Sequence, residues 1–134
     1  MANAKYRKAC ENYMFPNIVG NTVRASLIRT ASGYTPDIEN DEFYQDVPGA
    51  AVIFDGPALT GKTFTGGRFK ADNLNMGAVP ASPSADGIIL WHDTGDPATS
   101  RLLVWIDTAG GLPVTPNGTD YVVIYWPSNY IFSL

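Results

Sequence analysis

The sequence predicts a mainly β protein, an antiparallel β-sandwich or barrel of about eight short strands with one N-terminal α-helix. Three observations predict this class. Apolar and polar residues alternate with a period of two over much of the chain after residue 50, 13 glycines and 10 prolines punctuate it, and helical periodicity is confined to the first segment. A chain of 134 residues is expected to form one domain, with the helix over 1–16 and the β body over 20–134.

The first segment has the spacing of an amphipathic helix. Apolar side chains recur at i, i+3, i+4 and i+7, opposite charged and polar ones. Pro16 ends the pattern because proline cannot continue a helix. On the buried stripe, Cys10 is a small core residue rather than a nucleophile. The stripe comprises Ala2, Tyr6, Ala9, Cys10 and Tyr13, and the polar face comprises Lys5, Lys8, Glu11 and Asn12.

Residues 23–30 predict the first strand of the β body, with Val23, Ala25 and Leu27 on one face. Arg24 and Ser26 then fall on the opposite face.

A polar, acidic connection follows over residues 34–48. Within it, Asn40 is expected to cap a short helical turn over residues 41–46, because an Asn side chain accepts a hydrogen bond from a free N–H group of the first turn. Carboxylates in that first turn favour the helix dipole.

A β-hairpin is predicted around Gly66 and Gly67, since paired glycines supply the positive φ angles of a primed two-residue turn. The register places Phe64 opposite Phe69, and on the other face it places Thr63 opposite Lys70. Further strands are expected at residues 51–55, 74–79, 88–92, 102–107, 121–126 and 130–134, separated by turn clusters.

Two of these strands, LLVWID at 102–107 and YVVIYW at 121–126, are apolar on both faces. In an antiparallel sheet one face of each then needs a cover besides the core. The N-terminal helix can cover one face, and a neighbouring subunit is expected to cover whatever the helix does not. The interface candidates are Lys5, Arg7, Lys8, Leu103, Trp105, Tyr121, Val123 and Tyr125.

Charge and composition exclude several classes of function. The net charge of −4 argues against binding to a phosphate backbone, so no nucleic-acid partner is expected. No apolar run approaches the roughly 18 residues of a membrane span. A single cysteine allows no internal disulfide, and the opening segment lacks the pattern of a signal peptide, so maturation in a cytoplasm is expected. Residues 71–134 are acidic, because Arg101 is their only basic residue.

Residues 56–63, GPALTGKT, match the pattern G-x-x-x-x-G-K-[ST] of a phosphate-binding P-loop. A P-loop works only if a helix begins at the lysine, because the free N–H groups of that helix hold the phosphates. Here Lys62 is followed by Thr-Phe-Thr-Gly-Gly, which opposes a helix. The segment is therefore interpreted as a loop that leads into the hairpin.

No other pattern indicates a catalytic or metal site. His92 is the only histidine, and with Asp93 and Asp96 it offers no recognised ligand spacing, so residues 93–97 are interpreted as a turn. Asn117-Gly118-Thr119 is interpreted as a turn as well. We expect no enzymatic activity, no metal and no cofactor.

The three tryptophans and seven tyrosines leave one alternative open, because aromatic side chains on one flat face can bind sugars. Their position within predicted strands favours core or subunit packing over a carbohydrate-binding platform. The tryptophans are Trp91, Trp105 and Trp126.

Several segments together resemble a family of small tailed-bacteriophage proteins. They are MANAKYRKACENYM at the start, DEFYQDVPGAAV at 41–52, IILWHDTGDPATSRLLVWIDTAGGLPVTPNGTDYVVIYW at 88–126 and the closing NYIFSL. The matching features are a D-T-G turn, an L-P-V-T-P-N-G turn and a final I-F-x-L strand. The stretch from 60 to 79 matches least. These motifs are structural, so the resemblance carries over no active site.

The resemblance implies a virion structural protein, most simply a capsid decoration (cement) protein that bridges capsid subunits. Its expected partners are the major capsid protein and copies of itself, with a trimer as one option. Its expected location is the virion, after assembly in the host cytoplasm. A tail or head-to-tail connector component is the alternative within this class, and a carbohydrate-binding module is the alternative from another class.

Overall fold

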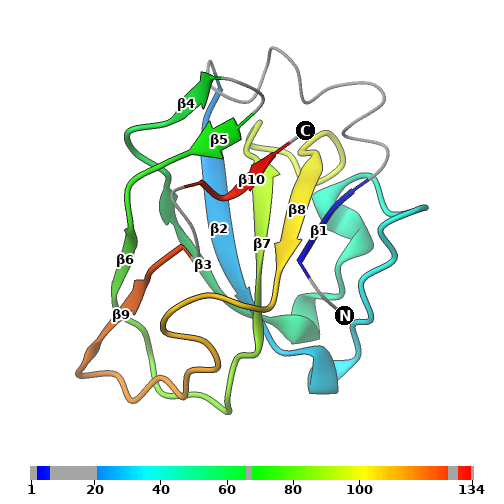
Figure 1. Ribbon diagram of the computed structural model, residues 1–134. Coiled ribbons are helices and arrows are strands. Elements are labelled where there is room, and N and C mark those ends of the chain that lie inside the picture. The colour runs from blue at the N-terminus through cyan, green and yellow to red at the C-terminus, as the bar shows by residue number, and fades with distance from the viewer. Residues whose placement is uncertain (1–2, 7–20, 66–67, 127–129, 134) are drawn as a thin grey trace.

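The computed structural model describes residues 3–6, 21–65, 68–126 and 130–133. The chain is mainly β in these residues, and all of its strand pairs are antiparallel, as the sequence predicts. The strands form one large sheet and two small ones (Figure 1). None of the helices in these residues is long and apolar enough to cross a membrane.

The large sheet has five strands in the order β1-β8-β7-β2-β3. It is open, with β1 and β3 at its two ends, so the described strands close no barrel. Its strands are β1 Ala4–Lys5, β2 Val23–Ile28, β3 Val52–Ala58, β7 Gly87–His92 and β8 Leu102–Ile106.

The predicted hairpin is confirmed as part of a three-stranded sheet. In it, β4 Thr63–Thr65 pairs with β5 Arg68–Lys70, and Phe64 faces Phe69 while Thr63 faces Lys70. The third strand, β10 Phe132–Ser133, pairs with β5. The two glycines of the turn lie outside the described residues. The rings of Phe64, Phe69 and Phe132 form one aromatic cluster, with centroids 5.4–6.2 Å apart.

The other small sheet is a ribbon of two strands, β6 Leu74–Ala78 and β9 Tyr121–Ile124. Both strands were expected at these positions. Figure 1 places the ribbon to one side of the large sheet, beyond β3.

The N-terminal helix expected over residues 1–16 is wrong in the part that the structure describes. Ala4 and Lys5 instead form β1, which pairs with β8, so that Ala4 lies opposite Trp105. The next residue, Tyr6, continues the pairing with an N–H bond to the Leu103 carbonyl. An edge strand with unpaired backbone groups competes here with a short amphipathic pattern. Residues 7–20, including Arg7, Lys8 and Cys10, lie outside the described residues.

Three turns of 3₁₀-helix lie in and beside the acidic connection: η2 Tyr44–Asp46 is within it, and η1 Thr30–Ser32 and η3 Gly49–Ala51 lie on either side of it. The turn predicted over 41–46 is therefore present only in its second half. Its N-cap residue is not Asn40, as predicted, but Phe43, and the Asp46 carboxylate reaches back to accept the N–H groups of Glu42 and Phe43 at 2.9 Å. Asn40 instead bonds to Asp37 in the preceding turn.

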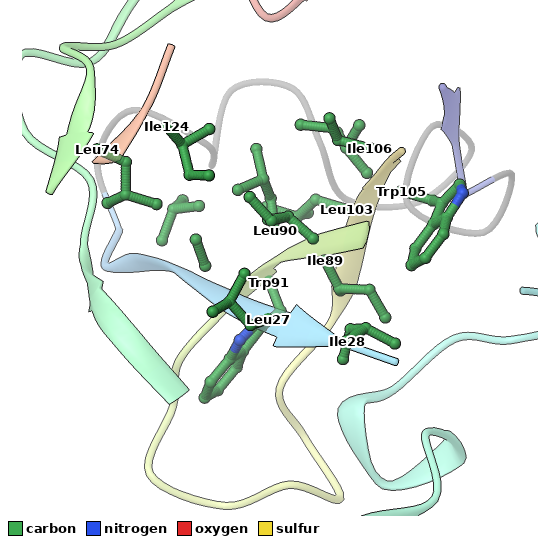
Figure 2. Close-up of a cluster of buried hydrophobic side chains, with 14 of the residues drawn as sticks. Leu27, Ile28, Leu74, Ile89, Leu90, Trp91, Leu103, Trp105, Ile106 and Ile124 are labelled. Atoms are coloured by element: carbon green, nitrogen blue, oxygen red, sulfur yellow. The ribbon is translucent and has the colours of Figure 1, made fainter. Parts of the chain in front are cut away.

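The core is one hydrophobic cluster that includes all five residues of β8 (Figure 2). Both faces of β8 are therefore covered by this chain itself. Gly87 is required for this packing, because a Cβ atom at Gly87 would lie 2.0 Å from the ring of Trp105. Strand β9, the other strand predicted to be apolar on both faces, is covered on one face only.

Candidate interaction surface

The candidate interaction surface is the outer face of β9, where large aromatic side chains are exposed to solvent. Val122 and Ile124 point into the core, whereas Tyr121 is 69% exposed and Tyr125, just beyond the end of the strand, is 54% exposed. These tyrosines are the exposed large hydrophobic residues among those described. Val123 lies between them and is partly buried. We call Tyr121, Val123 and Tyr125 the tyrosine face.

The backbone of the tyrosine face is held on both sides. On one side β6 pairs with β9, with Asn75 opposite Val123. On the other side Gly110 and Tyr125 exchange two backbone hydrogen bonds of 2.8 Å. The neighbouring Gly111 has a φ of +98°, and a Cβ atom there would lie 2.4 Å from the Val123 carbonyl oxygen. Glycine is thus needed where the 107–120 loop approaches β9.

A small hollow of about 170 Å³ opens beside Tyr121. The Asp120 carboxylate lies at this hollow, and Asn117 Nδ2 donates a 2.8 Å hydrogen bond to Asp120 Oδ2. Asn117 Oδ1 in turn accepts the N–H groups of Thr119 and Asp120, also at 2.8 Å. The predicted turn at Asn117-Gly118-Thr119 is confirmed, with Gly118 at a φ of +81°. Its hydrogen bonds hold one side of the hollow in place.

The structure separates the predicted interface residues into three groups. Tyr121, Val123 and Tyr125 lie together on the surface. Leu103 and Trp105 are buried, with exposed fractions of 0% and 2%, so they offer no surface to a partner and that part of the prediction is corrected. They were included because β8 was expected to have one uncovered face.

Lys5 lies in β1, at the opposite end of the large sheet from β3, and Figure 1 separates β1 from β9. It therefore does not join the tyrosine face. Arg7 and Lys8 cannot be placed, because they fall in residues 7–20.

The P-loop-like segment has the backbone of a turn followed by a strand. Gly61 adopts a φ of +64°, and the residue after Lys62 begins β4. The Lys62 ammonium donates to the Asn21 carbonyl rather than pointing into an anion site, and partial burial lowers the pKa of this amine. The interpretation of this segment as a loop leading into the hairpin is confirmed for residues 59–62, whereas residues 56–58 form the end of β3.

The turn after His92 is built by aspartate side chains, as predicted. Asp93 accepts the Gly95 N–H at 2.8 Å and the Arg24 side chain at 2.6 Å, and Asp96 accepts the Ala98 N–H at 2.9 Å. The Gly95 N–H and then Arg24 hold the pKa of Asp93 below its usual value, whereas desolvation lowers the pKa of His92. No group of three or more potential ligands surrounds a metal position in the described part of the chain.

Two polar networks beneath the acidic connection were not foreseen. Ser26 Oγ is fully buried, donates to Asp55 at 2.8 Å and accepts the Trp91 indole N–H at 2.9 Å. The Tyr44 hydroxyl reaches the same Ser26 oxygen at 2.9 Å and also contacts the Asp55 carboxylate. The Ser26 hydroxyl is buried and already bonds to Asp55, Tyr44 and Trp91. This network therefore holds the acidic connection in place and offers no free nucleophile.

The second network runs from Tyr6 through Tyr34 to Asp41. The two hydroxyl oxygens are 2.7 Å apart, and Tyr34 donates its proton to Asp41 Oδ2 at 2.9 Å, so Tyr6 must be the donor to Tyr34. Burial raises the pKa of both phenols and of the Asp41 carboxyl. Nothing in the sequence spacing of these residues signals their contact, because 28 positions separate the two tyrosines.

Of the aromatic side chains considered for a sugar platform, Trp91 and Trp105 are buried in the core. Trp126 is partly buried and donates its indole N–H to the Asp72 carbonyl at 2.9 Å. The tryptophans therefore do not line a flat exposed face, and the exposed aromatic residues of the described chain are the tyrosines of β9. Comparison with known proteins finds no family model that matches this chain and no significant match among curated proteins.

Proposed function

We propose that this protein is a structural component of a bacteriophage virion, and specifically a capsid decoration protein that binds the assembled head. The observation that carries the proposal is the tyrosine face of β9, which lies on a strand whose alternate residues are buried. Tyrosines are enriched in protein interfaces because they present a large apolar ring together with a hydroxyl that tolerates water. The resemblance of the turn motifs to small tailed-bacteriophage proteins supports the choice of a virion as the assembly.

In this proposal the protein works by binding and catalyses nothing. Each copy contacts the major capsid protein, and contacts between copies make the decoration an oligomer. A tyrosine face of this size gives a weak single contact, but many identical contacts on one particle add through multivalency. We also infer that the β body is a sandwich, in which the small sheets pack on the five-stranded sheet through the shared hydrophobic cluster.

Cosedimentation with purified, expanded capsids of the phage that encodes this protein tests the proposal. The native protein is expected to pellet with capsids and to raise their resistance to heat. Val123→Asp places a charge in the tyrosine face, and it is expected to abolish binding while leaving a folded protein, because an unpaired charge in a desolvated interface is costly. Val122→Asp is the matched control, which is expected to unfold the chain because Val122 is buried.

A second variant tests the same surface independently, so that a folding defect in Val123→Asp would not decide the result. Tyr121→Ser combined with Tyr125→Ser removes two exposed rings and leaves the core intact. Loss of capsid binding in this folded double variant supports the proposal. Undiminished binding in both surface variants, or localisation of the native protein to the tail in electron micrographs of the virion, contradicts the decoration function and favours a connector.

The same two tyrosines favour one function of another class, a carbohydrate-binding module. Aromatic side chains exposed on one face are what such a module requires, and Tyr121 and Tyr125 satisfy this requirement. Retention of the protein on a host cell-wall polysaccharide gel, lost in the double tyrosine variant, would favour this function over capsid binding.

A further inference from the structure

We infer that the tyrosine face and the adjoining hollow bind an arginine- or lysine-rich segment of the partner protein, an inference that rests on the proposed capsid-binding function. The occupant is a protein segment whose cationic side chains meet Asp120 and lie over Tyr121. Three independent observations support this choice: the charge around the face, the state of the Asp120 carboxylate and the chemistry of the exposed rings.

The first observation is that the ribbon and its flanking loops carry negative charge only. The ribbon and its flanking loops, residues 71–81 and 108–126, contain Asp72 and Asp120 but no lysine or arginine. Arg101, the only basic residue after position 70, is paired with Glu42 at 2.9 Å on another part of the molecule. An approaching positive segment is therefore attracted by the carboxylates of the ribbon and its flanking loops.

The second observation concerns Asp120. Asn117 holds its Oδ2 at 2.8 Å, so the carboxylate is oriented before any partner arrives. Within the described residues no group donates to its Oδ1 and no cationic side chain pairs with it. A guanidinium or ammonium group can therefore form a charge-assisted hydrogen bond to Asp120 without breaking an existing one.

The third observation is the position of the rings. The 170 Å³ hollow is lined by residues 114–117 and 120–122, so it includes both Asp120 and Tyr121. A cation held at Asp120 is then next to an exposed aromatic ring, and cations favour the face of such a ring. Tyr125 lies four residues further along the same side of β9 and offers a second ring to the next basic side chain. An apolar partner would gain nothing from the carboxylate, whereas a basic segment uses both features.

The direct test measures binding of fluorescein-labelled tetra-arginine to the full chain by fluorescence anisotropy. We expect saturable binding that weakens as NaCl is raised from about 50 to about 500 mM, because added salt screens exposed charges. Asp120→Asn keeps the shape of the side chain and its acceptor for Asn117, and it is expected to weaken binding about five- to tenfold, since the carboxylate supplies the charge-assisted bond. Tyr121→Ser is expected to weaken binding to a similar degree.

The matched control is Asp96→Asn, which removes one negative charge from an exposed turn between β7 and β8. It makes the net charge less negative by the same one unit as Asp120→Asn but leaves the tyrosine face unchanged, so affinity within twofold of the native protein is expected. An equal loss of affinity in Asp96→Asn and Asp120→Asn would reveal binding to overall charge and overturn the inference. An affinity for tetra-arginine that is unchanged in Asp120→Asn and Tyr121→Ser would overturn the inference as well.

Capsid binding separates this inference from the function on which it rests. If native protein binds capsids but Asp120→Asn binds them equally well at every salt concentration, decoration stands and the basic-segment inference fails. If tetra-arginine binding depends on Asp120 and Tyr121 but capsids are not bound, the inference stands and the decoration function fails. If light scattering shows self-association that Asp120→Asn abolishes, the basic segment belongs to a second copy, and the inference of a capsid partner is overturned.

Discussion

Tyr44 stacks on Trp91 with ring centroids 4.1 Å apart and planes 5° from parallel. One ring belongs to a short 3₁₀ turn in the acidic connection, and the other belongs to a strand in the middle of the large sheet. The hydrogen bonds of both side chains meet at Ser26. This stack and the shared hydrogen bonds hold the acidic connection against the large sheet, although the connection has no apolar run of its own.

Removing the Tyr44 hydroxyl should destabilise the protein without changing the stack. Tyr44→Phe loses the contacts to Ser26 and Asp55, and a decrease of about 1–2 kcal/mol in the free energy of unfolding is expected. Tyr44→Ser loses the stacked ring too and should cost more. Urea denaturation followed by tryptophan fluorescence measures both. A Tyr44→Phe protein as stable as the native one would mean that water replaces the hydroxyl at no cost.

The phenylalanine cluster of the hairpin should contribute strongly to stability. Phe69 is fully buried between Phe64 and Phe132, so Phe69→Ala is expected to lower the free energy of unfolding by about 3–5 kcal/mol. Its neighbour Lys70 is exposed, and Lys70→Ala serves as the control with an expected change within about 0.5 kcal/mol. Thermal denaturation by calorimetry distinguishes the two. Equal effects would contradict the packing of the hairpin on the core.

The N-terminal strand should be needed for stability. Tyr6 is completely buried, so Tyr6→Ala is expected to cost about 3–5 kcal/mol, a large part of a typical stability of about 5–15 kcal/mol. Tyr6→Phe loses only the hydrogen bond to Tyr34 and should cost about 1 kcal/mol. Circular dichroism melts test this order.

Deleting residues 1–6 removes β1 and leaves an edge of β8 unpaired, so aggregation is expected as well. Size-exclusion chromatography checks this outcome. A truncated chain that stays monomeric and melts at the native temperature would mean that β1 contributes nothing to the fold.

Asp93 should make the stability of the folded protein depend on pH in the acidic range. The Gly95 N–H and Arg24 lower the pKa of Asp93 in the folded state below its ordinary value of 3.8. The stabilisation is therefore complete above the pKa that Asp93 has in the unfolded chain, and it is lost as the pH falls through the lower pKa that Asp93 has in the folded state. Asp93→Asn should flatten the decrease in melting temperature between about pH 4 and pH 2. An unchanged slope would show that Asp93 is equally acidic in the unfolded chain.

Local sequence patterns were sufficient where neighbours in the chain are also neighbours in space. The pattern of paired glycines between apolar residues predicted the hairpin and its register, including Phe64 opposite Phe69. The aspartates of the 93–97 turn bond to N–H groups only two residues away. In these cases the interacting groups are so close along the chain that the spacing alone specifies the contact.

The sequence by itself thus determined the antiparallel β class, the approximate positions of the strands after residue 20 and the apolar surplus on two strands. Only the tertiary structure decided that β8 is enclosed while β9 keeps an exposed face, because that depends on which distant segments pack on each strand. It also decided that Ala4 and Lys5 pair with β8, since an open sheet edge outweighs a local helical pattern. For the same reason the hollow that Asp120 and Tyr121 share with residues 114–117 could be recognised only after folding placed this turn next to β9.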